Sequence, residues 1–319
     1  LAFEPILLEK VWGGRRLTSL EKTLPDGAMI GESWEVADLA ATSTSGAGGG
    51  AQRSVVVSGP MAGRTLREVC ERWGDALAPG SADCFPLLVK YLDAREHLSV
   101  QVHPSPAYAA SHPEAHLKTE CWYVIDADEG SRIFKGLRPG VTRSDLRSAI
   151  EAGTVPEVLA SVPAVPGEMH ELPSGTVHAL GAGVLVAEVQ TPSDTTFRVY
   201  DWAKELGRAG RELHIEQAIA CVELDEPPPA MAGPGMLCEN EFFRVREVRG
   251  DRGTVELGLA GCAAVMVVGG SASSVESKTG AFDAMPSPLG TTVLVPAACA
   301  GDVALRSGSG SVCLVCEVL

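Results

Sequence analysis

Two strand-like segments near residue 100 carry side chains of the kinds that bind metals. Residues 98–103 (LSVQVH) alternate apolar and polar types, the pattern of a strand with one buried face. Gln101 and His103 would then point toward the same polar side. Glu120 occupies a second such segment, residues 118–125 (KTECWYVI). If both strands face one cavity, these three side chains converge there and supply three of the four ligands of a mononuclear metal site.

A second imidazole completes the predicted ligand set. His178 comes directly after a Pro/Gly turn in residues 172–180 (LPSGTVHAL). With Gln101, His103 and Glu120 it would leave a divalent ion a net charge of about +1, because only one ligand is anionic. Such an ion can polarise a carbonyl or hold an enediolate. The oxygen and nitrogen ligands favour one zinc ion per chain, and they also accept iron, cobalt or manganese.

Several motifs that precede residue 225 resemble the type I mannose-6-phosphate isomerases, in their short bacterial form, which belong to the cupin superfamily. The longest are QVHP at 101–104, LKTECWYV at 117–124, GTVHALG at 175–181 and SDTTFRVYDW at 193–202. Shorter ones are KVWGG at 10–14, GESWE at 31–35, PLLVK at 86–90 and RELH at 211–214. The resemblance implies a metal-dependent enzyme that interconverts mannose 6-phosphate and fructose 6-phosphate through an enediol.

The resemblance also implies which residues carry the chemistry. Arg198 matches the catalytic arginine of the family, and a guanidinium can stabilise charge that develops on a substrate oxygen. The base stays open from the sequence. Lys118 lies one strand period from Glu120, where it could carry a proton or serve as a fixed charge for the phosphate. Glu188 is a carboxylate in an apolar strand, which is costly unless it is paired or functional. A water on the metal is the third alternative.

Five further residues are expected to contact the substrate. By resemblance, Lys204 helps to hold the phosphate and Lys90 lies near the site, although a solvated loop charge is the other interpretation of Lys204. Trp12 and Ser99 are substrate contacts by resemblance alone. Asp194 matches an active-site aspartate of the family, but its type also suits an ordinary turn. The remaining histidines are expected at the surface or at helix caps, namely His112, His116, His170 and His214.

The composition limits the partners and the compartment. The chain of 319 residues has 26 basic and 41 acidic side chains, a net charge of −15. Such a surface repels nucleic acid and anionic membranes, so an anionic substrate needs a local cationic pocket. No membrane span or secretory signal is visible in the sequence. Nine cysteines without framework spacing indicate a reducing, cytoplasmic environment.

The pattern of short strands and turns predicts an all-β fold, a cupin-type jelly roll with a second, smaller cupin-like β domain. We expect a catalytic domain at 1–225, a Pro/Gly linker at 226–235 and a β domain at 236–319 with a structural role. A small helical insertion is expected at about 140–160. Helices are predicted at 65–77, 142–152 and 213–222, and a low-complexity loop at 41–53.

Two other functions remain compatible with these features. One is a cupin isomerase for a different sugar phosphate, such as glucose 6-phosphate. The other is a non-catalytic, metal-containing sugar-binding protein. A redox cupin is disfavoured, because such enzymes prefer His-rich iron sites with open positions. The sequence does not indicate an oligomeric state.

Overall fold

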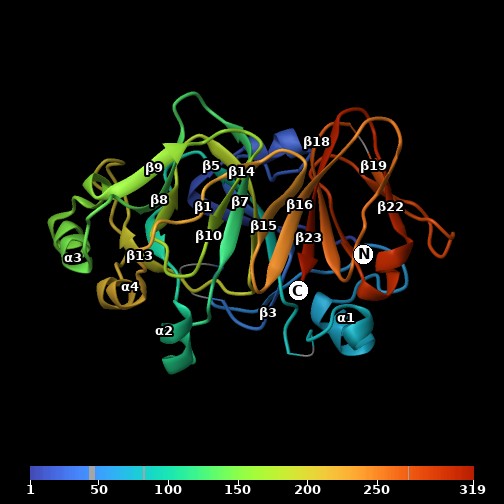
Figure 1. Cartoon of the computed structure of the whole chain (residues 1–319), viewed down its shortest axis with the longest axis horizontal. Helices are drawn as coiled ribbons and strands as arrows, with labels where there is room; N and C mark the ends of the chain where they lie inside the picture. The colour runs from blue at the N-terminus through green and yellow to red at the C-terminus, as the bar shows by residue number, and fades with distance from the viewer. Residues whose placement is uncertain (43–46, 82, 272) are drawn as a thin grey trace.

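Two antiparallel sheets make up the first two-thirds of the chain in the computed structural model, which describes residues 1–42, 47–81, 83–271 and 273–319 (Figure 1). The larger sheet has the strand order β1 (Ile6–Gly14), β2 (Ile30–Val36), β5 (Leu88–Ala94), β12 (Val184–Gln190), β7 (Glu120–Ala127), β10 (Glu168–Leu172) and β14 (Met231–Ala232). The smaller has the order β13 (Phe197–Tyr200), β6 (Val100–Val102), β11 (His178–Leu180), β8 (Arg132–Leu137) and β9 (Leu159–Pro163).

The last part of the chain forms two more antiparallel sheets. One has the order β15 (Gly235–Glu239), β16 (Phe243–Gly250), β23 (Ser311–Val318), β18 (Ala263–Gly269) and β21 (Thr292–Val295). The other has the order β17 (Thr254–Glu256), β22 (Val303–Arg306), β19 (Ser273–Ser277) and β20 (Met285–Ser287). A small pair joins β3 (Asp38–Leu39) to β4 (Gln52–Arg53). The expected all-β class is confirmed.

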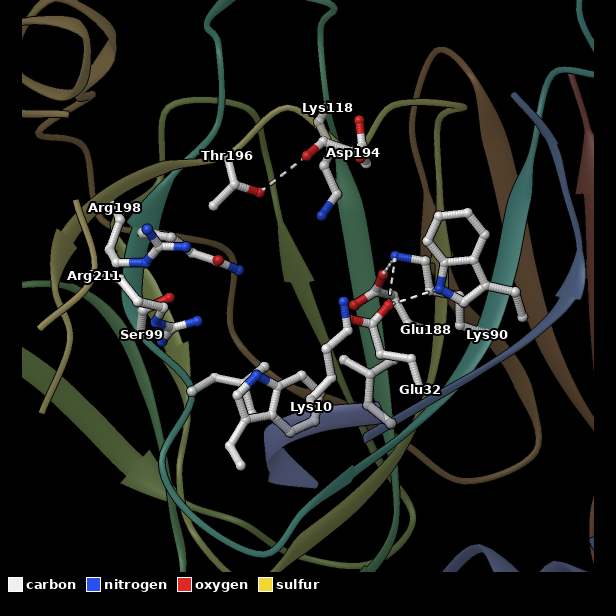
Figure 2. A pocket seen from close by; sticks show the side chains of 15 residues that line it. Lys10, Glu32, Lys90, Ser99, Lys118, Glu188, Asp194, Thr196, Arg198 and Arg211 are labelled. Atoms are coloured by element: carbon white, nitrogen blue, oxygen red, sulfur yellow. Dashed lines mark hydrogen bonds and ion pairs between the residues drawn. The ribbon is translucent and has the colours of Figure 1, made fainter. Parts of the chain in front are cut away.

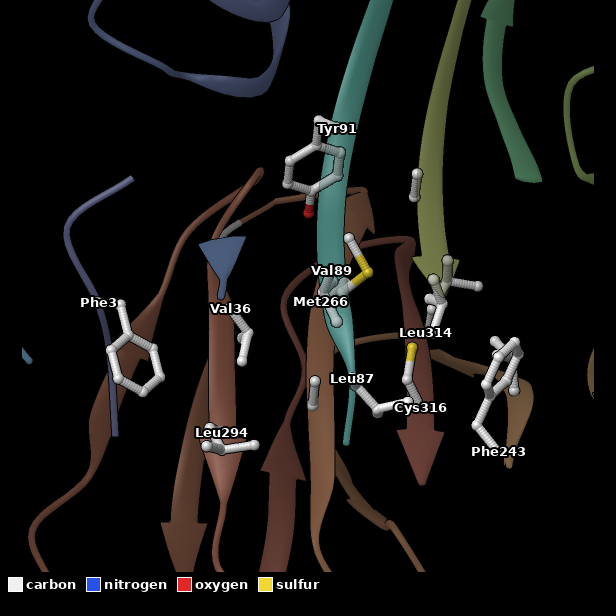
Figure 3. Close-up of a cluster of buried hydrophobic side chains, with 14 of the residues drawn as sticks. Phe3, Val36, Leu87, Val89, Tyr91, Phe243, Met266, Leu294, Leu314 and Cys316 are labelled. Carbon is white, nitrogen blue, oxygen red and sulfur yellow. The ribbon is translucent and has the colours of Figure 1, made fainter. Parts of the chain in front are cut away.

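Strand alternation divides the seven-stranded sheet into two unlike faces. Val89, Tyr91 and Cys121 point outward, where they share one hydrophobic core with Phe243 and Met266 of the C-terminal sheet (Figure 3). The residues between them, such as Lys90 and Trp122, point inward toward the five-stranded sheet. The sheet is therefore packed on its apolar side and left with an unusually polar inner side.

Four α-helices accompany the sheets. They are α1 (Leu66–Trp73), α2 (Pro106–Ser111), α3 (Arg143–Ala152) and α4 (Ile215–Cys221), with short 3-10 turns η1 (Arg16–Leu20), η2 (Gly74–Ala76), η3 (Val155–Glu157) and η4 (Ala297–Asp302). Apolar residues of α3 and α4 cover the outer face of the five-stranded sheet. Thr142 and Asp145 form a capping box at the start of α3, and Thr65 and Glu68 form another at the start of α1.

Some local expectations differ from the structure. Strand β6 begins only at Val100, so the Leu98 side chain lines the inner cavity instead of pointing to the same face as Val100. The His97 ring stacks on that of Trp202 at a centroid distance of 4.6 Å. His170, expected at the surface, is buried in β10. Residues 43–46 of the expected loop at 41–53 lie outside the described residues, and its end at 52–53 forms β4.

The segment expected to be a linker also contributes structure. Its residues Met231–Ala232 pair with β10 as the edge strand β14, and the Lys135 ammonium donates to the Pro228 carbonyl at 2.5 Å. The division of the chain at 226–235 stays a prediction.

Cys313 and Cys316 are buried on opposite faces of β23, as expected of apolar strand residues. Within the described residues, no helix has the length and apolar character needed to cross a bilayer.

Candidate metal centre and active-site cavity

The register of the five-stranded sheet places site residues in one row. Arg198 on β13 pairs with Gln101 on β6, Gln101 pairs with His178 on β11, and His178 pairs with Lys135 on β8. Directly opposed residues of antiparallel strands present their side chains to the same face. A guanidinium, an amide and an imidazole therefore stand side by side on the inner face.

The seven-stranded sheet supplies the opposite wall. Glu188 on β12 pairs with Lys90 on β5 and with Trp122 on β7. Glu120 lies two residues before Trp122 on the same strand and pairs with Gln190. Because residues two apart on a strand share a face, both carboxylates point inward. The two sheets thus face each other with polar rows.

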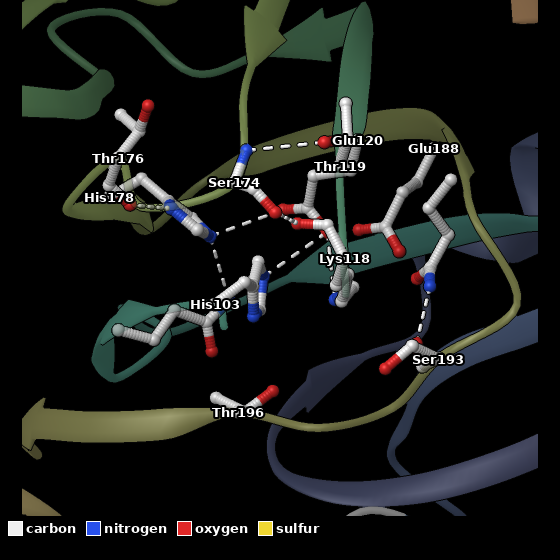
Figure 4. A network of polar contacts seen from close by, with 12 residues as sticks. His103, Lys118, Thr119, Glu120, Ser174, Thr176, His178, Glu188, Ser193 and Thr196 are labelled. Atoms are coloured by element: carbon white, nitrogen blue, oxygen red, sulfur yellow. Dashed lines mark hydrogen bonds and ion pairs between the residues drawn. The ribbon is translucent and has the colours of Figure 1, made fainter. Parts of the chain in front are cut away.

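His103, Glu120 and His178 meet between these rows (Figure 4). Their nearest ligand atoms all lie within 4.8 Å of one another. The Nε2 atom of His103 is 3.4 Å from Oε2 of Glu120, and the Nε2 atom of His178 is 3.2 Å from Oε1. Each side chain is no more than 1% exposed. Three of the four predicted metal ligands therefore converge in a buried position.

Backbone contacts fix how the two imidazoles face this point. The Nδ1 atom of His178 lies 2.8 Å from the Thr176 carbonyl, and that of His103 lies 3.0 Å from the Thr195 carbonyl. A carbonyl only accepts hydrogen bonds, so Nδ1 carries the proton in both rings and Nε2 is left with a lone pair. A backbone oxygen behind Nδ1 is the usual support of a metal-binding histidine.

The chemistry of these atoms fits a bound cation. Within the described residues, Nε2 of His103 and both oxygens of Glu120 are buried and meet no hydrogen bond, and the one cation beside them is Lys118, which forms an ion pair with Oε2 of Glu120. Lone pairs of two imidazoles and a carboxylate that face one another repel unless a positive ion lies between them. The site therefore has the donor set, burial and orientation that a zinc ion requires.

Gln101 lies beside this group. Its Nε2 atom is 3.2 Å from Nε2 of His178. The oxygen and nitrogen of an amide are assigned from the surrounding network, so a turn of the amide brings Oε1 to the same place. The fourth predicted ligand is thus within reach of the three others.

Lys118 controls the charge at this centre. Its Nζ atom is 2.7 Å from Oε2 of Glu120, and both side chains are buried. Burial raises the pKa of Glu120, but Lys118 and His103 outweigh it and hold that pKa well below its usual range. Burial, reinforced by the charge of Lys118, lowers the pKa of His103 to about 3. The carboxylate is therefore ionised and His103 is neutral, the states that bind metals.

Turns hold the centre in place. The Ser174 hydroxyl donates to the carbonyls of Pro104 (2.8 Å) and Lys118 (3.1 Å), which ties together the segments that carry His103 and Lys118. Gly175 follows with φ of 89°, and a Cβ there would lie 2.8 Å from a backbone oxygen of α4. Only glycine fits this turn, which leads into His178.

A cavity opens beside the centre (Figure 2). The space between the atoms that line it, part of it open solvent at the mouth, is about 720 Å³. Of the residues predicted to act on the substrate, those that line it are Trp12, Lys90, Ser99, Lys118, Glu188, Asp194 and Arg198. Lys204 is exposed on the turn after β13 and does not line the cavity.

Alternating charges form one side of the cavity. The Lys10 ammonium is 3.1 Å from Oε1 of Glu32, and the Lys90 ammonium is 3.7 Å from Oε2 of Glu32 and 3.0 Å from Oε1 of Glu188. Indole N–H groups of Trp34 and Trp122 donate to Glu32 (2.7 Å) and Glu188 (2.8 Å). Positive and negative groups balance one another on this side.

Two guanidinium groups form the opposite side. Arg198 is buried, and its Nη1 donates to the Glu212 carbonyl at 2.9 Å. Arg211 also lines the cavity, with Nε bound to Oδ1 of Asp201 at 2.6 Å. Burial, followed by the charge of Arg211, lowers the pKa of Arg198. The two cations are therefore close enough to repel each other.

Sequence reasoning missed three charged residues of this cavity, namely Lys10, Glu32 and Arg211. Each lies inside a short motif that was noticed only for its resemblance. One signal was available for Glu32: a carboxylate between the apolar residues of a buried strand, the same reason that singled out Glu188. No neighbouring residue in the sequence indicates that Arg211 lines the cavity, because its position depends on how the chain folds back after β13.

Comparisons with known proteins agree with this geometry. A sequence model of the family described as "Phosphomannose isomerase type I, catalytic domain" matches residues 3–133. The chain is 40% identical over 230 residues to mannose-6-phosphate isomerase ManA of Bacillus subtilis, which covers 72% of this chain and 69% of the relative. It is 39% identical over 234 residues to mannose-6-phosphate isomerase of Streptococcus mutans, covering 71% and 70%.

Solved structures extend the similarity to the whole chain. The mannose 6-phosphate isomerase structure from Bacillus subtilis superposes with a TM-score of 0.82 at 28% identity, covering 99% of this chain and 98% of that one. A zinc-bound mannose 6-phosphate isomerase has a TM-score of 0.72 at 16% identity, covering 100% and 99%, which shows a shared fold. The cupin-type architecture is thereby confirmed, and the chain belongs to the type I mannose-6-phosphate isomerase family.

Proposed function

We propose that this chain is a mannose-6-phosphate isomerase that interconverts mannose 6-phosphate and fructose 6-phosphate with one zinc ion. The observation that carries the proposal is the trio His103, Glu120 and His178, whose buried lone pairs converge beside a cavity lined with charged groups. The relatives named above bear the same activity in their names, and one related structure is zinc-bound.

We propose that Gln101, His103, Glu120 and His178 hold the zinc ion. When bound, zinc acts as a Lewis acid toward oxygens next to the reacting carbons and lowers the cost of an enediolate. The three clustered ligands are buried, so the ion would lie in surroundings of lower dielectric constant than bulk water. Electrostatic effects are larger there than in water.

The reaction moves a proton between C1 and C2 of the open-chain sugar. Arg198 and Lys118 line the cavity as cations and are placed to stabilise negative charge on the sugar oxygens. Glu188 is a candidate base, and both of its oxygens are engaged, one by Lys90 and one by Trp122. Those contacts orient the carboxylate toward the cavity. Trp12, Ser99, Lys90 and Asp194 are proposed to contact the substrate.

A coupled assay with purified, zinc-loaded protein tests the proposal. Fructose 6-phosphate should yield mannose 6-phosphate, and equilibration in D₂O should place deuterium at C1 of fructose 6-phosphate, as an enediol requires. The absence of turnover with zinc and with other divalent ions would favour a sugar-binding protein. Faster conversion of glucose 6-phosphate would favour the alternative isomerase.

We also propose that the protein acts in the cytoplasm on a small sugar phosphate, without nucleic acid or membrane partners. All nine cysteines are free thiols, and the net charge of −15 disfavours anionic surfaces. Fractionation of cells that express the chain would test the location.

A further inference from the structure

The guanidinium side of the cavity contains a cation that the proposed function has not yet used. We propose that Arg211, positioned by Asp201, binds the phosphate group of the substrate and makes the site selective for phosphorylated sugars. This inference rests on the proposed function, because it assigns the recognition of one part of the proposed substrate.

The chain brings Arg211 to the cavity by folding back after β13. Asp201 is the first residue after β13, and Trp202 then turns the chain with a left-handed φ of 50°, which is unusual for a bulky residue. The returning segment runs beside β13: the backbone N–H of Arg211 donates to Oδ2 of Asp201 at 2.9 Å, and that of His214 donates to the Arg198 carbonyl at 2.8 Å. Trp202 is anchored in turn, because its indole N–H donates to the Leu98 carbonyl at 2.8 Å.

Asp201 holds one edge of the Arg211 guanidinium and leaves the other edge available. Its Oδ1 accepts hydrogen bonds from Nε and Nη2 of Arg211. Asp201 is buried, whereas the Arg211 side chain is 31% exposed at the cavity. Within the described residues, no hydrogen bond engages Nη1 of Arg211. A fixed guanidinium with free donors is suited to bidentate binding of phosphate oxygens.

The charges of the cavity favour the phosphate at this end. Lys10, Lys90, Glu32 and Glu188 balance one another on the opposite side. Arg198 makes no ion pair with a carboxylate in the part of the chain that the structure describes. Two guanidiniums beside one aspartate therefore leave a net positive charge at the Arg198 end. The rest of the protein, with its net charge of −15, repels an anion, so this local excess must attract it.

Lys204 is the competing phosphate ligand, expected from the family resemblance. Its side chain is exposed on the turn between Trp202 and Arg211, outside the residues that line the cavity. Arg211 reaches the cavity in the structure as it stands, which is why we assign the phosphate to it.

Steady-state kinetics of zinc-loaded variants test this assignment. Arg211→Gln should raise KM for mannose 6-phosphate, and the inhibition constant of inorganic phosphate, by about 10- to 100-fold, the effect of losing hydrogen bonds to a charged group. Its kcat should change little, because the phosphate lies away from the reacting carbons. Asp201→Asn should give a smaller rise in the same two constants, and Arg211→Lys should recover part of the loss.

Controls separate recognition from damage to the fold. Arg147→Gln removes an equal charge from the surface of α3, where Arg147 pairs with Glu216, and should leave KM and kcat unchanged. Zinc content should match wild type in the Arg211 variants, and circular dichroism should show them folded at the assay temperature, although loss of the ion pair with buried Asp201 lowers the melting temperature. A fall in kcat with unchanged KM, or a larger rise in KM for Lys204→Gln than for Arg211→Gln, would overturn the assignment.

Calorimetry distinguishes failure of this inference from failure of the proposed function. Binding of inorganic phosphate to the zinc-loaded protein needs no turnover, and it should weaken in Arg211→Gln. If the wild type does not isomerise mannose 6-phosphate but this difference holds, only the proposed function fails. If the wild type isomerises and phosphate binds both proteins equally, only the phosphate assignment fails.

Discussion

Replacing Glu32 by glutamine should destabilise the protein, because it removes the anion shared by two cavity lysines. Glu32 is 13% exposed, and its carboxylate lies 3.1 Å from Lys10 and 3.7 Å from Lys90. Burial raises the pKa of Glu32, but the two lysines and the Trp34 indole outweigh it, and the net effect lowers the pKa from 4.5 to about 2. The carboxylate is thus ionised at all ordinary pH values.

The size of the effect follows from this shift. A pKa difference of one unit corresponds to about 1.4 kcal/mol, so the ionised Glu32 contributes about 3 kcal/mol at neutral pH. Because the folded-state pKa is the lower one, this stability is present above pH 4.5 and is lost as pH falls toward about 2. Removing one partner of a buried ion pair ordinarily costs about 3–5 kcal/mol, which agrees.

Urea unfolding of zinc-loaded wild type and Glu32→Gln, followed by circular dichroism at several pH values, measures the difference. We expect it to be about 3 kcal/mol at pH 7 and to shrink below pH 4.5. Glu276→Gln is the matched control, since Glu276 pairs with exposed Arg306 and should give a small loss. A Glu32 difference below about 1 kcal/mol at pH 7, or one that grows on acidification, would refute the reasoning.

Four other outcomes are expected. Arg198→Ala should lower kcat by about 100-fold or more while zinc content, measured by mass spectrometry, is retained; joint loss of both would contradict its catalytic role. Glu120→Gln should abolish stoichiometric zinc binding and lower the melting temperature, whereas a zinc-replete variant would exclude Glu120 as a ligand. His170 should make the protein acid-sensitive, because burial and the charge of Lys135 lower its pKa from 6.5 to about 4. The stability that the neutral imidazole contributes is fully present above pH 6.5 and is lost as pH falls to about 4. In His170→Phe the unfolding free energy should therefore depend less on pH between 6.5 and 4. Thr142→Ala should cost about 1 kcal/mol in unfolding free energy by removing the cap of α3, and a neutral result would show that the capping box is dispensable.

The sequence was sufficient for those parts of the fold that depend on neighbours along the chain. The cap at Thr142 requires only residues three apart, and the apolar segment around Glu188, expected to be a strand, forms β12 (Val184–Gln190). The types of Gln101 and His103 on one polar strand face likewise pointed to a ligand pair.

What the sequence could not predict depends on pairing between distant strands. The row of Arg198, Gln101, His178 and Lys135 exists only because three strand registers align, and those registers are set by packing of both sheets. The same holds for Arg211, which reaches the cavity through a turn stabilised by Asp201, ten residues earlier. His170 was misjudged because polarity argues for exposure, whereas it lies on β10 directly opposite the buried Trp122 of β7.

The role of the C-terminal sheet follows from the two faces of the seven-stranded sheet. Its inner face buries Lys90, Glu120 and Glu188 and leaves Glu32 only 13% exposed, and paired buried charges stabilise a fold less than well-packed apolar residues of similar size would. The inner face also carries a small apolar cluster, in which Val124 and Val186 pack against Ile133 of the five-stranded sheet, but it is smaller than the core on the outer face. The outer face compensates, because its apolar residues bury themselves against β16, β23 and β18 in the largest core of the molecule (Figure 3). The C-terminal sheet therefore supports the seven-stranded sheet, which carries the predicted metal ligand Glu120 and the charged cavity residues. Within the described residues, it contributes no side chain to the lining of that cavity.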